Sequence, residues 1–282
     1  MFRKSIYKTP AQLRSMVEPG LITAAALDAV RPLMRAGVTT AELDAAAERV
    51  ILQRGAESNF KLVRGYRHTT CVSVNEQVVH GIPGELMLQP GDIVSVDCGA
   101  QYQGWNGDSA RTFVVPDPAR PELVARRQEL SRVTEGSMWA GIAAMASATH
   151  VGQVGAAIQD HIEAQGPSAV SGATYGILRE YVGHGIGRKM HEAPSVFNYR
   201  TPDAGAEIRD GLVLAIEPMV TAGGEATLVE DDDWTVSTVD GTDGAHWEHS
   251  VARHAGGIWV LTAADGGAAG LAPFGVTPVP IP

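Results

Sequence analysis

Cysteine is scarce in this 282-residue chain, which carries only Cys71 and Cys98. Two cysteines are too few for a disulfide scaffold, and this scarcity is consistent with a reducing cytosol. Cys98 directly follows Asp97, so on a strand the two side chains should face opposite sides. We therefore interpret Cys98 as a small buried residue.

Long apolar runs are also missing, because none approaches the roughly 18 residues that a membrane helix needs. The start, Met1–Lys4, is basic like a signal peptide, but the apolar stretch 21–30 contains Asp28 and follows Glu18-Pro-Gly20. A cleaved signal peptide is not expected. These features predict a soluble cytoplasmic protein, and we expect it to be a monomer.

Basic residues are outnumbered: 22 Lys and Arg against 32 Asp and Glu give a formal net charge of −10. This balance disfavours nucleic acid or an anionic membrane as a general partner. The sequence has no G-x-S-x-G nucleophile motif and no phosphate-binding G-x-x-x-x-G-K-S/T loop. The glycine cluster 183–187 is spaced G-x-G-x-G, which is not the dinucleotide fingerprint.

Local patterns nevertheless predict a large mixed α/β domain. Caps and apolar periodicity predict helices over residues 9–34, 39–55, 121–148 and 154–165. We expect Pro19 to kink or divide the first helix. Strands are predicted over residues 71–79, 92–97, 110–115, 178–182, 212–216, 234–239 and 246–253. The end of the chain, 263–282, is rich in glycine, alanine and proline and is expected to be a flexible tail.

The order of helices followed by a hairpin occurs twice, which indicates an internal duplication. In each half a carboxylate stands six positions after a turn glycine: Asp97 after Gly91, and Glu217 after Gly211. We interpret residues 1–262 as one catalytic domain made of pseudo-repeat halves at about 40–115 and 120–262. Acidic residues from both halves would then meet at the junction between them.

Four carboxylates and one histidine form a pattern that suits two metal ions: Asp97, Asp108, His184, Glu217 and Glu248. Two neighbouring cations need several anionic oxygens to offset their repulsion, and a carboxylate to bridge them. Asp97 ends an apolar strand, where an unpaired buried charge would cost several kcal/mol. A turn centred between Tyr102 and Gln103 would make Asp97 and Asp108 direct cross-strand partners, with Cβ atoms about 5 Å apart.

The other three ligands are predicted from their surroundings. Glu217 ends the apolar stretch 212–216, and Glu248 lies between bulky residues on a predicted strand. Flanking glycines around His184 allow a close approach of backbone to a ligand. Oxygen-rich ligation with a single imidazole favours Mn, Fe(II) or Co over a structural zinc site. The remaining histidines without such a context are taken as structural: His68, His150, His161, His246, His249 and His254.

With these motifs in view, the chain resembles a type I methionine aminopeptidase from about residue 9 to residue 261. The matching segments are 73–83 with His80, Asp97 with Asn106-Gly-Asp108, Gly183-His184-Gly-Ile-Gly187, His191-Glu-Ala-Pro194, Ile216-Glu217-Pro-Met219, and Trp234-Thr-Val236 with Glu248-His-Ser250. All five ligand positions match in order.

The resemblance implies the pita-bread fold, in which two pseudo-symmetric α/β halves surround a central antiparallel sheet flanked by helices. It also implies removal of the initiator methionine from nascent proteins whose second residue is small, with transient association with ribosomes. Attack would come from a water that bridges the two metals. By analogy Asp97 chelates one metal, Asp108 and Glu248 bridge, and His184 with Glu217 complete the other.

The same resemblance implies roles in catalysis and substrate binding. Glu217 would accept the proton, His191 would contact the scissile carbonyl, and His80 would contact the amide beyond it. The methionine pocket maps onto Tyr66, Cys71 and Trp234. The sequence departs from the family pattern at Phe60, Val63, Arg67 and Met190, which raises the question of pocket shape.

Two other interpretations remain open. One is an X-Pro aminopeptidase, prolidase or creatinase of the same fold, although such enzymes usually carry a sizeable extra N-terminal domain and Asp97 comes early for one. The other is a non-enzymatic binding protein that kept the fold and lost the metals, although all five ligand positions are intact.

Overall fold

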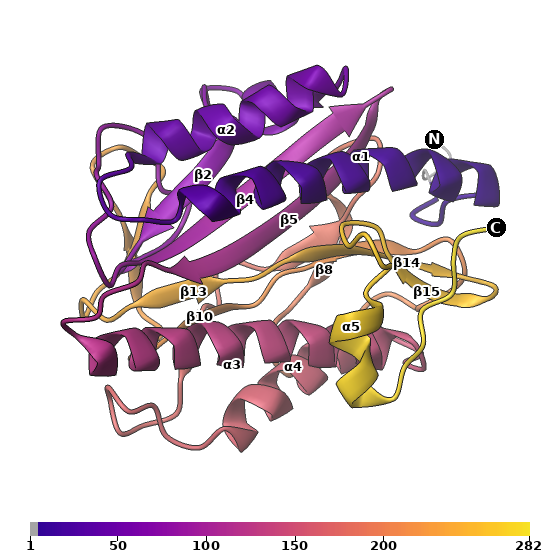
Figure 1. Ribbon diagram of the computed structural model, residues 1–282. Helices are drawn as coiled ribbons and strands as arrows, with labels where there is room; N and C mark the ends of the chain where they lie inside the picture. The colour runs from indigo at the N-terminus through magenta and orange to yellow at the C-terminus, as the bar shows by residue number, and fades with distance from the viewer. Residues whose placement is uncertain (1–4) are drawn as a thin grey trace.

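Two pairs of helices enclose the strands, as Figure 1 shows for the computed structural model, which describes residues 5–282. One pair is α1 (Pro10–Val30) and α2 (Thr40–Gln53), and the other is α3 (Pro121–Met145) and α4 (Gly152–Ala164). Shorter helical segments are η1 (Arg31–Leu33), η2 (Phe60–Leu62), α5 (Ala268–Leu271) and η3 (Ala272–Phe274). The basic start Met1–Lys4 lies outside the described residues. Within residues 5–282, no helix is both long and apolar enough to cross a membrane.

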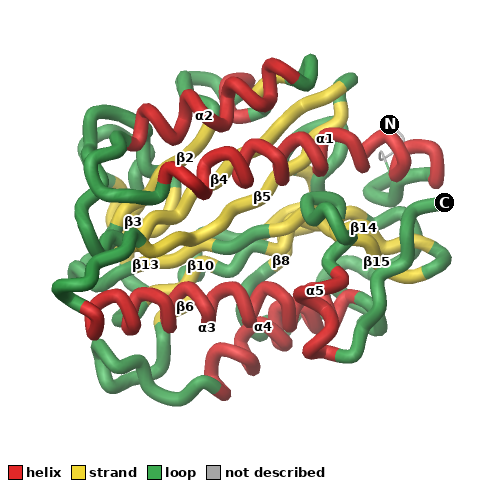
Figure 2. Tube along the Cα trace, viewed as in Figure 1, coloured by secondary structure: helices red, strands yellow, loops and turns green. Residues whose placement is uncertain are grey.

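In the described chain the strands pair antiparallel in four groups, which lie between the helical layers in Figure 2. The first group contains β1 (Glu57–Ser58), β2 (Thr70–Val74), β4 (Ile93–Tyr102) and β5 (Trp105–Val114). The second has the order β15 (Gly257–Val260), β14 (His249–His254), β9 (Val213–Ile216), β7 (Gly183–Gly185) and β8 (Glu192–Val196). The third has the order β13 (Gly244–His246), β10 (Met219–Thr221) and β6 (Gly176–Ile177), and the fourth β11 (Thr227–Val229), β12 (Val236–Thr238) and β3 (Gln77–Val79).

The predicted helix caps are present. Thr39 and Glu42 form a reciprocal capping box at the start of α2, and Thr9 does the same with Gln12 at the start of α1. Just past the end of α2, Gly55 has a φ of +70°, a conformation that favours glycine.

We expected Pro19 to kink or divide the first helix: division is wrong, because α1 continues through Pro19 as one helix, and the kink stays a prediction. Pro19 and Gly20 are both buried, and a Cβ on Gly20 would lie 2.4 Å from the carbonyl oxygen of Leu261. The carbonyl of Pro19 also accepts a hydrogen bond from Thr23 Oγ1 at 2.9 Å. Tertiary packing at this point outweighs the local disruption by proline.

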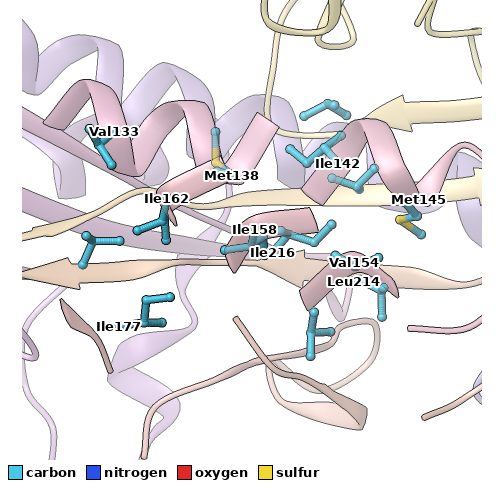
Figure 3. Close-up of a cluster of buried hydrophobic side chains, with 14 of the residues drawn as sticks. Val133, Met138, Ile142, Met145, Val154, Ile158, Ile162, Ile177, Leu214 and Ile216 are labelled. Carbon is cyan, nitrogen blue, oxygen red and sulfur yellow. The ribbon is translucent and has the colours of Figure 1, made fainter. Parts of the chain in front are cut away.

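Two large cores hold the helices against the strands. In Figure 3, side chains of α3 and α4, among them Met138, Ile142 and Ile158, pack with Leu214 and Ile216 of β9. A second core packs α1 and α2 against β2 and β4, and Cys98 lies within it as expected. Each fully buried aliphatic side chain contributes about 1.5–3 kcal/mol to stability.

Three strand predictions need correction. The β-prone stretch 71–79 forms two strands, β2 and β3, which belong to different sheets. The predicted strand 178–182 is not a strand, because regular pairing stops at Ile177 and resumes at Gly183, and residues 180–182 line a cavity instead. The predicted single strand 246–253 is interrupted between β13 and β14. All three departures occur where the backbone leaves one sheet for another.

The C-terminal stretch 263–282, for which we expected a flexible tail, packs against the body in the structure. Leu271 is fully buried in the core of α3 and α4. Val279 donates a backbone hydrogen bond to Ile258 at 2.9 Å and accepts one from His254 Nε2. Pro282, at the end of this stretch, accepts a hydrogen bond from Arg14 of α1, so residue 282 lies beside the first helix (Figure 1).

Candidate active site

The β4–β5 hairpin brings Asp97 and Asp108 to one face, although in a register other than the predicted one. The turn consists of Gln103 and Gly104, with φ values of +50° and +72°, as in a two-residue hairpin turn in which both residues are left-handed. Asp97 therefore lies opposite Ala110, and Asp108 lies opposite Gly99. The direct cross-strand pairing that we predicted is wrong. The two aspartates are diagonal neighbours that still share a face.

Glu217 and Glu248 occupy two facing interruptions in paired strands. β9 ends at Ile216 and β10 begins at Met219, while β13 ends at His246 and β14 begins at His249. Because β9 pairs with β14 and β10 with β13, these two gaps lie opposite each other. Glu248 is thus not on a strand, contrary to our expectation, because the chain changes sheets there.

Backbone hydrogen bonds at Glu248 join the second half to the first. Its N–H donates to the carbonyl of Ala110 at 3.0 Å, and its carbonyl accepts from Ser109 Oγ at 2.6 Å. Ser250 Oγ in turn donates to the Asp108 carbonyl at 2.8 Å. These contacts hold Asp108 and Glu248 next to each other.

His184, on β7, presents a lone pair to the same cluster. Its Nδ1 donates to the carbonyl of Gly185 at 3.0 Å, which leaves Nε2 without a hydrogen while the ring is neutral. Burial lowers the pKa of His184 to about 4, so the ring is neutral at physiological pH. Nε2 lies 3.3 Å from Oε1 of Glu217. Two electron-rich atoms at that distance repel each other unless a cation or a proton lies between them.

Each of the four carboxylates has a buried oxygen with no hydrogen-bond partner among residues 5–282: Asp97 Oδ1, Asp108 Oδ1, Glu217 Oε1 and Glu248 Oε1. All four acids line one cavity of about 490 Å³. Burial raises the pKa of Asp97 to about 7. It also raises the pKa of the other three well above their ordinary values.

Divalent cations would give these buried carboxylate oxygens partners and would offset the cost of burying four acids together. Ligand atoms of Asp108, His184 and Glu248 lie within 4.8 Å of one another, and so do those of Glu217, His246 and Glu248. Hard oxygen donors with an occasional imidazole are the ligands that Mn, Fe(II) and Co accept. The donor set and the unpartnered oxygens therefore fit a pair of divalent ions.

His80 and His191 line the same cavity. His80 follows β3 with a φ of +61°, and its ring lies 5.4 Å from that of Tyr181. Burial lowers the pKa of His80 to about 4 and also lowers the pKa of His191. The His191 ring stands edge-on to that of His184, with centroids 4.4 Å apart. Both neutral imidazoles can donate or accept hydrogen bonds beside the acids.

An apolar region adjoins the acidic cluster. Tyr66 packs against Trp234 with ring centroids 4.9 Å apart, and buried Cys71 and Phe60 complete its floor. Met190 packs against this group, so it contributes to the shape of the pocket. Arg67 is exposed and is not among the residues lining the cavity. Of these two departures from the family pattern, only Met190 contacts the pocket.

His246 was interpreted as structural, but it lines the cavity. It is only 3% exposed, and its Nε2 lies 3.6 Å from Oε2 of Glu217. Its position two residues before Glu248 was an available signal, although it is hard to use because the strand breaks between them. The other histidines taken as structural lie outside the cavity lining, and His249 and His254 make buried hydrogen bonds.

Comparisons with known proteins agree with this site. Residues 14–254 match the model of metallopeptidase family M24. The chain is 43% identical over 256 residues to methionine aminopeptidase 1 of Mycobacterium tuberculosis, covering 90% of this chain and 94% of that protein. It is 40% identical over 257 residues to methionine aminopeptidase 1 of Bacillus subtilis, covering 91% and 98%.

Solved structures give the same result. The crystal structure of methionine aminopeptidase from Thermotoga maritima superposes with a TM-score of 0.83 at 38% identity, covering 93% of this chain and 99% of that one. Prolidase from Pyrococcus furiosus has a TM-score of 0.68 at 21% identity, with 92% of this chain covering 66% of that one, and so shows a shared fold alone. The expected pita-bread fold is confirmed. The chain belongs to metallopeptidase family M24 and, within it, to the methionine aminopeptidases, which are metal-dependent exopeptidases.

Proposed function

We propose that the cavity is a two-metal centre with which this chain removes the initiator methionine from nascent proteins whose second residue is small. The observation that carries the proposal is the set of four buried, unpartnered carboxylate oxygens whose residues line one cavity together with an apolar group of side chains. Asp97 would chelate one ion, Asp108 and Glu248 would bridge, and His184 with Glu217 would hold the other. When bound, such ions polarise a carbonyl and acidify a water at neutral pH.

The chain's own residues would carry the remaining steps. Glu217 would accept a proton; its position in the cavity lining and the hydrogen bond from Asn198 to its carbonyl at 3.1 Å support this role. His191 would donate to the scissile carbonyl oxygen as charge develops there, and His80 would contact the amide on the far side.

The pocket of Tyr66, Cys71 and Trp234 would take the methionine side chain. Aromatic faces and sulfur make favourable contacts with a thioether, and the tyrosine hydroxyl is already used in a hydrogen bond to the carbonyl of Thr70 at 2.7 Å. The pocket therefore presents an apolar surface, which favours an uncharged side chain at this position.

We further propose a cytoplasmic, monomeric enzyme that associates transiently with ribosomes. The scarcity of cysteine supports the cytoplasm, and nascent chains as substrates support an encounter near the ribosome. The organisation into duplicated halves at 40–115 and 120–262 is likewise a proposal, supported by the two separate cores, which largely follow these halves.

The test is peptide cleavage by purified protein supplied with Mn, Fe(II) or Co. We expect release of methionine from Met-Ala and Met-Gly peptides and no release of leucine from Leu-Ala peptides of the same length. Cleavage of X-Pro peptides, with Met-Ala peptides left intact under every metal, would instead favour the prolidase interpretation.

A further inference from the structure

His246 reaches the cavity with a buried nitrogen that the roles given above do not use. Its Nε2 has no hydrogen-bond partner among residues 5–282, and the side chain is only 3% exposed. A charged group lies just beyond hydrogen-bond distance, because Glu217 Oε2 is 3.6 Å away. An orphaned polar atom in a buried position calls for an explanation.

The backbone of His246 is placed by both halves of the protein. Its N–H donates to Ser95 Oγ of β4 at 3.1 Å and to Thr112 Oγ1 of β5 at 3.0 Å. Its carbonyl accepts from Thr112 Oγ1 at 2.8 Å, and His246 pairs with Met219 of the neighbouring strand β10. Such a defined position indicates that the imidazole is held toward Glu217 and is not a loose filler of the cavity.

Glu217 consequently lies between two imidazoles: the nitrogen that faces it carries a lone pair in His184 and can carry a hydrogen in His246. On one side, Oε1 faces the lone pair of His184 Nε2 at 3.3 Å, where an ion of the proposed centre would be held by both atoms. On the other side, Oε2 faces His246 Nε2, and a hydrogen on that nitrogen would bond the carboxylate directly. A shift of a few tenths of an ångström closes this contact, and catalytic hydrogen bonds are often long before ligands bind.

We propose that His246 is a positioning residue: its Nε2–H donates to Oε2 of Glu217 and so keeps Oε1 directed at the ion shared with His184. This inference rests on the proposed two-metal centre. Direct ligation by His246 is the competing arrangement, since Glu217, His246 and Glu248 could also hold an ion. Glu217 lies closer to His184 than to His246, with Oε1 at 3.3 Å from His184 Nε2 and Oε2 at 3.6 Å from His246 Nε2, so the geometry favours an ion on the His184 side and hydrogen bonding by His246.

The proposal predicts a loss of metal affinity and of turnover without a loss of fold. Mutation of a residue that hydrogen-bonds to a metal ligand typically lowers metal affinity or activity by about 10- to 100-fold. We expect His246→Leu to weaken Co(II) binding, and to lower kcat on a Met-Ala-Ser peptide, by about this factor, with KM within about twofold. His246→Gln, whose side-chain amide can donate in place of the imidazole, should recover most of both.

A matched control is His254→Leu, because His254 is a buried histidine on β14 outside the cavity. It should lower the midpoint of thermal unfolding while Co(II) affinity stays within about twofold of the unchanged protein. Co(II) titrations by calorimetry, thermal unfolding in chelator, and kcat and KM would be measured on the same preparations. X-ray absorption of the Co(II) form should show one imidazole for every two cobalt ions.

Three results would overturn the proposal. Affinity in His246→Leu within twofold of the unchanged protein would remove the positioning role. Two imidazoles per two cobalt ions, with one lost in His246→Leu, would make His246 a ligand. If His246→Leu does not fold, then His246→Gln decides, and affinity below one-tenth of the unchanged protein contradicts donation by the amide. Absence of Co(II) binding by the unchanged protein is a separate outcome, which would defeat the two-metal function itself and this inference with it.

Discussion

The buried acids should make the metal-free protein lose stability as the pH rises, and bound metal should reverse this trend. Asp97, Asp108, Glu217 and Glu248 have folded-state pKa values above their ordinary ones because they are buried. The folded protein therefore holds more protons than the unfolded chain, and the free energy of unfolding falls with increasing pH.

Histidines oppose this effect at lower pH. Burial lowers the pKa of His80, His184 and His249, so their contribution to stability rises with pH until the unfolded chain's histidines, whose pKa is about 6.5, are almost all neutral at about pH 7.5. Above that pH only the acids act. Each acid that keeps its proton in the folded state changes the free energy of unfolding by about −1.4 kcal/mol per pH unit.

Over one pH unit, from about 7.5 to 8.5, an acid that stays protonated in the folded protein removes about 1.4 kcal/mol. Since 1 kcal/mol shifts the unfolding midpoint by about 2 °C in a chain of this size, the metal-free protein should melt about 3 °C lower at the upper pH, and more if several acids stay protonated. Metal at 100 times its Kd should add about 2.7 kcal/mol per site.

The assay is thermal unfolding at closely spaced pH values, with chelator or with Mn(II) or Co(II). The matched variant is Asp97→Asn, which removes one buried ionisable group: its metal-free form should melt above the unchanged protein at pH 8.5 and should gain less from added metal. A melting temperature of the metal-free protein that is constant or rises from about pH 7.5 to 8.5 would refute the reasoning.

Three further predictions concern single residues. Asp108→Asn should remove most peptidase activity while circular dichroism stays unchanged, because a bridging carboxylate serves both ions; near-normal turnover would exclude bridging. His191→Ala should lower kcat about 100-fold with little change in KM, since the donor acts on charge that develops during the reaction; an effect on KM alone would assign it to binding. Lys8→Met should lower the free energy of unfolding by about 2 kcal/mol, because Lys8 pairs at 2.9 Å with partly buried Glu192. The double variant Lys8→Met/Glu192→Gln should be no less stable than Lys8→Met alone. An additive loss in the double variant would show that the two residues are not coupled.

Local sequence patterns determined most of the helices and the identity of the candidate ligands. Capping boxes at Thr9 and Thr39 depend only on residues three positions apart, so they are visible without tertiary structure. Likewise, Asp97 at the end of an apolar strand already indicated a buried charge that needs a partner. Both signals are local, but the structure preserves only the capping boxes as predicted: β4 continues past Asp97 to Tyr102, so Asp97 is buried in the middle of a strand and not at its end.

Long-range packing decided what the local patterns could not. Whether Pro19 interrupts α1 depended on the close contact of Gly20 with Leu261, about 240 residues away in sequence. The centre of the hairpin turn moved by one position, and the residue opposite Asp97 by two, because Gln103 and Gly104 both adopt left-handed backbone angles, and one non-glycine residue in that conformation is hard to foresee.

The chain alone therefore predicted the acids and His184 as a candidate metal-binding set, because residue type and spacing are properties of the sequence. Only the fold decided that Glu217 and Glu248 lie in facing gaps between strands, and that His246 stands 3.6 Å from Glu217. The physical reason is that the groups near a buried carboxylate depend on where separate strands pass from one sheet to another. Packing between the two halves of the molecule determines those positions.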